Sequence, residues 1–305
     1  TLTITIHGTN DAPVVANATA ALSGTVIEAG HNDDGSAVVG TATATGALSV
    51  RDADANASHN WSLQGSPSTT YGTMSIQASS GVWTYTLDNS LAATQALKEG
   101  EVVTQTYIAR ATDDFGAWVD QTLTITIHGT NDAPVISSSA AQASGVVREQ
   151  GNNDDGSVSS GMASVSNRII ASDADRDSTR VYELEGSVST RYGSIALNRD
   201  TGEWTYTLNN TLVATQNLRE GQSVQERYTV RVTDDRGAQV RQTITVTVEG
   251  SNDAPTVVDA LEYKEYLQGE QMQMPTAQLF SDIDLDAGSF SFTAELPAGM
   301  QIDAQ

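Results

Sequence analysis

Apolar and polar residues alternate along several stretches of this 305-residue chain. In "TLTITIH" (1–7), Leu and Ile alternate with Thr, and "WTYTL" (83–87) and "VVTQTYIARA" (102–111) follow the same pattern. A period of two residues is typical of a β-strand that buries one face. Gly, Asn, Asp and Ser interrupt these stretches about every ten residues, which predicts a β-sandwich of about seven to nine strands per module.

The alternating stretch that ends in Asn-Asp-Ala-Pro occurs at a fixed spacing. Thr1, Thr122 and Thr243 each open a copy of it, so the period is 121 residues. The two complete copies align without a gap, as when "GVWTYTLDN" (81–89) is laid over "GEWTYTLNN" (202–210). A fixed period indicates an array of modules. The chain is therefore predicted to be all-β, with tandem β-sandwich modules joined by short linkers.

One stretch in each module breaks the alternation. "DNSLAATQALKEG" (88–100) predicts a short helical turn, with Asn89 or Ser90 as the N-cap of the run that Leu91 begins. Trp83 and Trp204 occupy equivalent positions in the middle of a predicted strand. Because large aromatic side chains are mostly buried, we expect both in the cores.

The net charge of −23 is the most unusual feature of the composition. Nucleic acids and anionic membranes would repel such a surface, so we expect neither as a partner. The charge favours a solvated acidic surface or bound cations. The chain has no Cys, which excludes disulfides and thiolate sites. No apolar run approaches the ~20 residues needed to cross a bilayer.

Three acidic motifs recur where turns are expected. They are an Asp-x-Asp motif, an Asp-Asp-x-Gly motif and the Asn-Asp-Ala-Pro step. The Asp-x-Asp motif supplies Asp52, Asp54, Asp173, Asp175, Asp282, Asp284 and Asp286. The other two supply Asp113, Asp234, Asn10, Asp11, Asn131, Asp132, Asn252 and Asp253.

Oxygen atoms of carboxylates and Asn side chains are the ligands that Ca²⁺ prefers, and like charges this close repel unless a cation compensates them. The sequence therefore predicts Ca²⁺ at these motifs. The alternative is that they are solvated turns, since Asp and Asn are common turn formers. An EF-hand fits poorly, because the stretch from Asp282 lacks Gly at the sixth position and Glu at the twelfth.

Each Asn-Asp-Ala-Pro step lies between the last strand of one module and the first strand of the next. Pro13, Pro134 and Pro255 fix their own φ and favour an extended conformation for the preceding Ala. The step is thus a short, stiff linker that carries oxygen ligands. Without a cation we expect the modules to reorient about residues 128–135, because short inter-domain contacts rarely fix an angle.

The order of these motifs resembles that of cadherin repeats, in which an Asn-Asp-x-Ala-Pro linker and two acidic loops hold Ca²⁺ between domains. "VIEAG" (26–30) and "ALKEGE" (96–101) look like that family's upstream Glu and Leu-Asp-Arg-Glu elements, although Lys98 stands in place of the Asp. The resemblance implies that further ligands come from the module before each linker. These candidates are Glu28, Glu149, and Glu99 or Glu101.

Residues 1–255 also resemble the VCBS repeat of large bacterial RTX-type adhesins, through "WTYTLDN", "ALKEGE", "ATDDFGA" and "TLTITIHGTNDAPV". "LFSDIDLDAGSFSFTAELPAGM" (279–300) is similar to dystroglycan-type cadherin-like modules. These resemblances imply Ig-like or cadherin-like modules. They divide the chain into the last strand of a preceding repeat (1–9), two VCBS-like modules (10–130 and 131–251) and the start of a truncated cadherin-like module (252–305).

The implied function is mechanical: an extracellular extender on a bacterial cell surface, stiffened by Ca²⁺ at its linkers, that supports cell adhesion and biofilm. Its partners would be neighbouring modules of the same chain, with the distal ligand bound by other domains. The alternative is a carbohydrate- or protein-binding module of an adhesin or a secreted hydrolase. We expect no enzyme activity, because the sequence has no Ser-His-Asp order, His-Glu-x-x-His motif or phosphate loop.

Overall fold

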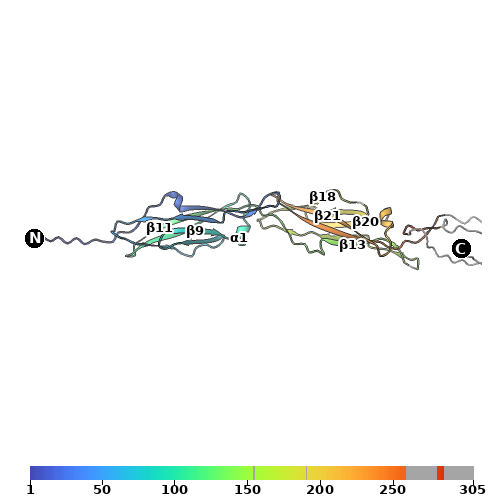
Figure 1. Ribbon diagram of the computed structural model, residues 1–305, viewed down its shortest axis with the longest axis horizontal. Coiled ribbons are helices and arrows are strands. Elements are labelled where there is room, and N and C mark those ends of the chain that lie inside the picture. The colour runs from blue at the N-terminus through green and yellow to red at the C-terminus, as the bar shows by residue number, and fades with distance from the viewer. Residues whose placement is uncertain (154, 190, 259–279, 285–305) are drawn as a thin grey trace, which may run out of the picture.

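The protein is described by a computed structural model that covers residues 1–153, 155–189, 191–258 and 280–284. Two β-sandwiches, here called the first and second sandwich, lie end to end along the long axis of the molecule (Figure 1). The first contains strands β1 to β11 and the second β12 to β22. This all-β tandem architecture confirms the predicted fold class. In the described ranges, no helix is long and apolar enough to span a bilayer.

The first sandwich consists of two main sheets. In the first sheet β2 and β11 run parallel and the other neighbours antiparallel, in the order β2 (Ser23–Ile27), β11 (Trp118–His128), β10 (Val102–Asp113), β7 (His59–Leu63). The second sheet is antiparallel, in the order β5 (Thr43–Ala47), β9 (Val82–Leu87), β8 (Gly72–Ile76). Short elements complete the sandwich: β1 (Val14–Val15) paired with β6 (Val50–Arg51), β3 (Gly30–His31) with β4 (Ala37–Val38), and the 3₁₀ turn η1 (Thr19–Leu22).

The second sandwich repeats this arrangement. Its main sheets have the orders β13 (Ser144–Arg148), β22 (Gln239–Glu249), β21 (Ser223–Asp234), β18 (Arg180–Glu185), and β16 (Ser164–Arg168), β20 (Glu203–Leu208), β19 (Gly193–Leu197). Its short pairs are β12 (Val135–Ile136) with β17 (Ala171–Ser172), and β14 (Gly151–Asn152) with β15 (Val158–Ser159). Beyond it, β23 (Thr256–Val257) pairs with β24 (Phe280–Ser281), as β12 pairs with β17. Most of the predicted third module lies outside the described residues.

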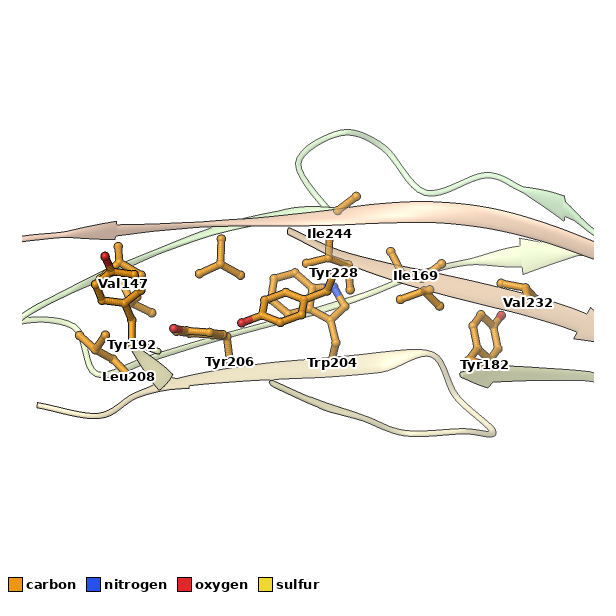
Figure 2. Packing of buried hydrophobic residues seen from close by; sticks show 14 of the residues in the cluster. Val147, Ile169, Tyr182, Tyr192, Trp204, Tyr206, Leu208, Tyr228, Val232 and Ile244 are labelled. Atoms are coloured by element: carbon orange, nitrogen blue, oxygen red, sulfur yellow. The ribbon is translucent and has the colours of Figure 1, made fainter. Parts of the chain in front are cut away.

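Each sandwich has its own apolar core between the main sheets. Trp83 on β9 and Trp204 on β20 are completely buried, as expected. Their indole N–H groups donate to the carbonyl oxygens of Ala21 and Gln142, at 3.0 Å and 3.1 Å. Figure 2 shows Trp204 among the other core side chains of the second sandwich. The equivalent bonds indicate that both tryptophans position the start of the strand that follows η1 or its counterpart.

The predicted helical turn is present in both copies, as α1 (Ala92–Gln95) and α2 (Val213–Gln216). The predicted cap is wrong: Leu91 is the N-cap residue, and it makes no side-chain cap bond. The side-chain oxygen of Asn89 instead accepts a hydrogen bond from the N–H of Ala29 at 3.0 Å. Asn89 is therefore used to hold the loop that carries Glu28, which leaves it unable to cap the turn.

Residues 1–13 contain no strand, although residues 1–7 have the same sequence as residues 122–128 of β11. The β11 copy pairs with β10 on one side and with β2 on the other. Among the described residues no strand pairs with residues 1–7, and Leu2, Ile4 and Ile6 are exposed. The alternation gives residues 1–7 an apolar face that a strand could bury, but a β-strand also needs a neighbouring strand with which to form hydrogen bonds. The assignment of residues 1–9 to a preceding repeat stays a prediction.

In each core two tyrosine hydroxyls meet a buried polar side chain, and the chemistry of that side chain differs between the copies. In the first sandwich the hydroxyls of Tyr85 and Tyr107 donate to Oε1 of Gln105, at 3.0 Å and 2.8 Å. In the second, the hydroxyls of Tyr206 and Tyr228 donate to Oε2 of Glu226, at 2.6 Å and 2.8 Å. The 2.6 Å separation is in the range for a hydroxyl that donates to a carboxylate.

We predict that Tyr206→Phe destabilises the second sandwich more than Tyr85→Phe destabilises the first. Loss of a hydrogen bond to a charged group costs about 1.5–3 kcal/mol of unfolding free energy, against about 0.5–1.5 kcal/mol for a neutral partner. Urea unfolding of the two variants, followed by tryptophan fluorescence, measures the difference. Equal losses in the two sandwiches would contradict this account of Glu226.

Candidate metal centre at the linkers

The linker at residues 131–134 gathers acidic side chains from both sandwiches. Asn131 and Asp132 are buried there, as are Asp175 and Asp234 from the second sandwich. Glu28, in the loop after β2 of the first sandwich, has no exposed surface. The structure therefore brings the linker and loop residues that the sequence predicted into one region.

Two hydrogen bonds fasten this linker to the second sandwich. The N–H of Asp132 donates to Oδ2 of Asp175 at 2.8 Å, and the side-chain amide of Asn131 donates to Oδ2 of Asp234 at 3.0 Å. The other oxygen of Asp234 accepts from the backbone N–H groups of residues 236–238, so that it closes its own turn. The Asn-Asp-Ala-Pro step is thus hydrogen-bonded to both acidic loops of the second sandwich.

Three buried carboxyl oxygens at this linker have no hydrogen-bond partner. They are Oδ2 of Asp132, Oδ2 of Asp173 and Oδ1 of Asp175. A buried polar atom without a partner costs free energy, and a buried charge costs more. Hard cations bind carboxyl oxygen, so unpartnered oxygens of this kind fit a Ca²⁺ ligand set.

Burial and mutual repulsion disturb the protonation of these groups. Burial, aided by the charges of Asp132 and Asp175, raises the pKa of Glu28 to about 8. Burial likewise raises the pKa of Asp175 to about 6, with Asp132, Asp173 and Asp234 as repelling neighbours. The pKa values of Asp132 and Asp173 are raised too, mainly by burial. The carboxyl groups are thus crowded together, and His31 and Arg180 offset only part of the effect of burial and repulsion at Asp132 and Asp173.

The carboxyl oxygens of the central linker lie in one region, but they are not arranged around a common point. Within the described ranges, no group of three or more His, Asp or Glu side chains is arranged so that it could hold a metal ion. One oxygen of Asp175 and one of Asp234 already accept hydrogen bonds from the linker. The metal-ligating roles therefore stay a prediction.

Glu99 and Glu101, the other candidates from the first sandwich, differ from the buried Glu28. Glu99 is exposed. Oε1 of Glu101 lies 3.3 Å from the guanidinium of Arg176 in the second sandwich, and its Oε2 accepts from the N–H of Lys98. In this arrangement Glu101 is an ion-pair partner across the junction.

The linker at residues 10–13 repeats the hydrogen bonds but not the burial. The side-chain amide of Asn10 donates to Oδ2 of Asp113 at 2.9 Å, and the N–H of Asp11 donates to Oδ2 of Asp54 at 2.8 Å. Asn10 and Asp11 are exposed. Oδ2 of Asp52 lies 3.1 Å from a ring nitrogen of His59. Asn10 and Asp11 are therefore better solvated than Asn131 and Asp132, whereas Asp113 is buried like its counterpart Asp234.

The linker after the second sandwich resembles the central one in its described part. The N–H of Asp253 donates to Oδ2 of Asp284, and Oδ2 of Asp253 and Oδ1 of Asp284 are buried without partners. Burial, with the charge of Asp253, raises the pKa of Glu149 to about 7. Asn252 is exposed, Asp282 accepts from the N–H of Asp284, and Asp286 lies outside the described residues.

Sequence reasoning missed one residue at each junction. The N–H of Ala133 donates to Nδ1 of His31 at 3.1 Å, and the N–H of Ala254 donates to Oδ1 of Asn152 at 3.1 Å. His31 and Asn152 occupy equivalent positions in the two copies. Both residue types place an acceptor atom one bond beyond Cγ, and this shared feature was the available signal.

Comparison with known proteins supports a cadherin-like fold. Residues 131–250 match the family described as bacterial cadherin-like domain. No curated protein matches the chain. Similar solved structures include mouse cadherin-23 EC22–24 (16% identity, 78% of this chain, 64% of that chain, TM-score 0.37). Protocadherin gamma B7 domains 1–4 is also similar (15% identity, 83% of this chain, 55% of that chain, TM-score 0.37). So is titin z1z2 in complex with telethonin (14% identity, 80% of this chain, 99% of that chain, TM-score 0.30). The chain thus spans less than two thirds of the first two structures.

We predict that, in metal-free buffer, the unfolding free energy falls as the pH rises from about 4.5 to about 8. A carboxyl with a raised folded-state pKa binds its proton more tightly when folded, so its stabilising effect is complete at low pH and is lost through this window. Glu28→Gln should make the decline shallower, whereas Glu203→Gln, on the exposed side of β20, should leave it unchanged. Urea unfolding at a series of pH values tests this, and an unaltered slope in Glu28→Gln would contradict it.

Proposed function

We propose that this chain is an extender segment of a bacterial cell-surface adhesin, in which Ca²⁺ at the linkers stiffens a row of β-sandwiches. The observation that carries the proposal is the set of buried, unpartnered carboxyl oxygens where one sandwich meets the next. In this proposal, residues 10–130 and 131–251 are VCBS-like modules of the RTX adhesin type. They act outside the cell and support adhesion and biofilm.

The proposed Ca²⁺ site at residues 131–134 draws on both sandwiches. Asn131, Asp132, Asp173, Asp175 and Asp234 would supply oxygen from the linker and the second sandwich. Glu28 would supply it from the first, where its carboxyl accepts a hydrogen bond from the N–H of Thr130 beside the linker. The bound ion would supply the positive charge that offsets their repulsion.

Such a site would couple the two sandwiches energetically. A ligand that binds only the folded, aligned state stabilises it by about 2.7 kcal/mol at a concentration 100 times its Kd. Extracellular modules bind Ca²⁺ with Kd values on the order of 10⁻⁴–10⁻³ M. Several junctions in series would form a rod that holds a distal domain away from the cell. The matched family indicates no catalytic activity, and we propose none.

A second candidate function has one observation in its favour. Phe115 and Trp118 in the first sandwich are 76% and 52% exposed, and the guanidinium of Arg110 lies 3.6 Å from the ring centre of Trp118. Exposed aromatic rings are suited to bind sugars or apolar protein surfaces. The second sandwich has Arg236 and Gln239 at these positions, so the feature is not part of the repeat. Glycan-array binding that is lost in Trp118→Ala would favour this alternative.

We predict that Asp173→Asn/Asp175→Asn loses at least one Ca²⁺ per chain, because both side chains contribute unpartnered oxygens to the central linker. Isothermal titration calorimetry on the full chain measures the stoichiometry. Asp200→Asn, in an exposed turn of the second sandwich, is the matched control and should bind as the unmodified chain does. Unchanged stoichiometry in the double variant would exclude this ligand assignment.

We also predict that the linker at residues 10–13 binds Ca²⁺ more weakly than the linker at residues 131–134. Asn10 and Asp11 are exposed, whereas Asn131 and Asp132 are buried and have the carboxyl of Glu28 beside them; fewer charged ligands lower Ca²⁺ affinity. Asp52→Asn/Asp54→Asn should therefore remove a weaker phase of the titration than Asp173→Asn/Asp175→Asn removes. Loss of phases with equal affinity would argue against a two-sided site.

A further inference from the structure

The first sandwich also touches the second through a loop that holds none of the predicted ligands. A Cβ added at Gly35 would lie 2.7 Å from the carbonyl oxygen of Gln239, and one added at Gly237 would lie 3.3 Å from Cγ of Asp33. Real Cβ atoms essentially never approach other atoms within 3.0 Å. The loop at residues 32–36 and the turn at residues 235–239 are thus so close that the backbone at Gly35 has no room for a side chain.

The repeat provides an internal comparison for this contact. Gly35 and Gly156 are equivalent residues with φ values of +80° and +79°, so the backbone conformation favours Gly at both. Among the described residues, nothing lies within 4 Å of a Cβ added at Gly156. The turn residues behave in the same way, since a Cβ at Gly116, the equivalent of Gly237, also meets no described atom. In the described residues, this close approach is made at the central junction.

A second group of contacts joins the sandwiches at another loop. The N–H of Arg176 donates to the carbonyl oxygen of Ala96 at 3.4 Å, and its guanidinium lies 3.3 Å from Glu101. The ammonium of Lys98 lies 3.5 Å from Oδ2 of Asp177. Exposed ion pairs contribute little by themselves. They do select orientation, because charge complementarity favours one arrangement of two surfaces over others.

The charged residues that receive these contacts are specific to the second sandwich. Positions 176 and 177 hold Arg and Asp, whereas the equivalent residues of the first sandwich are Ala55 and Asn56. Asp177 has a φ of +57° and Asn56 has a φ of +65°, so the backbone is left-handed at this position in both loops. The charged side chains at 176 and 177 match the second sandwich to the loop that carries Lys98 and Glu101.

We propose that these two groups of contacts form a docking interface that keeps the second sandwich in line with the first without any bound cation. The interface selects the angle between the sandwiches, and a cation at the acidic linker would strengthen an alignment that already exists. This goes beyond the proposed function and opposes the sequence-based expectation that the sandwiches reorient freely when no cation is bound. Glu101 is the one predicted ligand among the residues of these contacts.

The test is a distance measurement between the sandwiches in chelator. The natural chain has no Cys, so spin labels at Thr73→Cys and Ser194→Cys, equivalent exposed sites on β8 and β19, report the relative orientation by pulsed electron spin resonance. We expect one narrow distance distribution for the full chain in chelator. Gly35→Ala should broaden it and lower the docked-to-undocked ratio by about tenfold, as expected when a methyl group is forced into a packed contact.

Gly156→Ala is the matched control, because it imposes the same backbone strain on the same loop without the contact. Gly237→Ala against Gly116→Ala repeats the comparison from the other side of the interface. Thermal unfolding of all four variants verifies that the sandwiches remain folded. A broad distribution for the unmodified chain in chelator, or equal effects of Gly35→Ala and Gly156→Ala, would overturn the docking interface. Neither result would alter the Ca²⁺ stoichiometry, which tests the proposed function separately.

Discussion

Carboxyl groups are buried where one sandwich ends and the next begins, and the path of the linker depends on this burial. Carboxylates lose hydration when buried, and backbone N–H groups restore only part of it. Thr130 donates to Glu28, and Asp132 donates to Asp175, yet the pKa values of both carboxyls remain raised. Because the linker itself supplies these donors, it cannot slide or turn without leaving more carboxyl oxygens unpaired. The acidic cluster thereby determines how the chain passes from one sandwich to the other.

The two copies show which parts of this arrangement are essential, because the same bonds are made by different residues. His31 and Asn152 both accept from the backbone N–H of the linker Ala. In the cores, Gln105 and Glu226 both receive two tyrosine hydroxyls. What is repeated is the position of an acceptor atom, and the residue type varies around it.

Two kinds of contact with different physical origins meet at the central junction. In the acidic cluster the carboxylates repel one another, and positive charge would stabilise them. The approach of Gly35 to the backbone of Gln239 is instead a close steric contact. In our proposals the first responds to cations and pH, whereas the second sets the angle between the sandwiches. A junction that combines them would keep one geometry while its stability varies, which suits the extender that we propose.

The sequence was enough to predict the β-sandwich class, the 121-residue period, the burial of Trp83 and Trp204 and the position of the acidic motifs at the junctions. These follow from alternation and from repetition, which are local properties that can be read along the chain. Glu28 was reached through a family resemblance, and its complete burial is a property of the fold.

Three findings could not be predicted from the sequence. They are which carboxyl oxygens are buried without partners, that Glu101 faces Arg176, and that Asn89 holds a loop and does not cap a helix. The reason is the same in each case. Solvation, pairing and close approach depend on residues far away in the sequence, so identical local patterns have different outcomes when their neighbours differ.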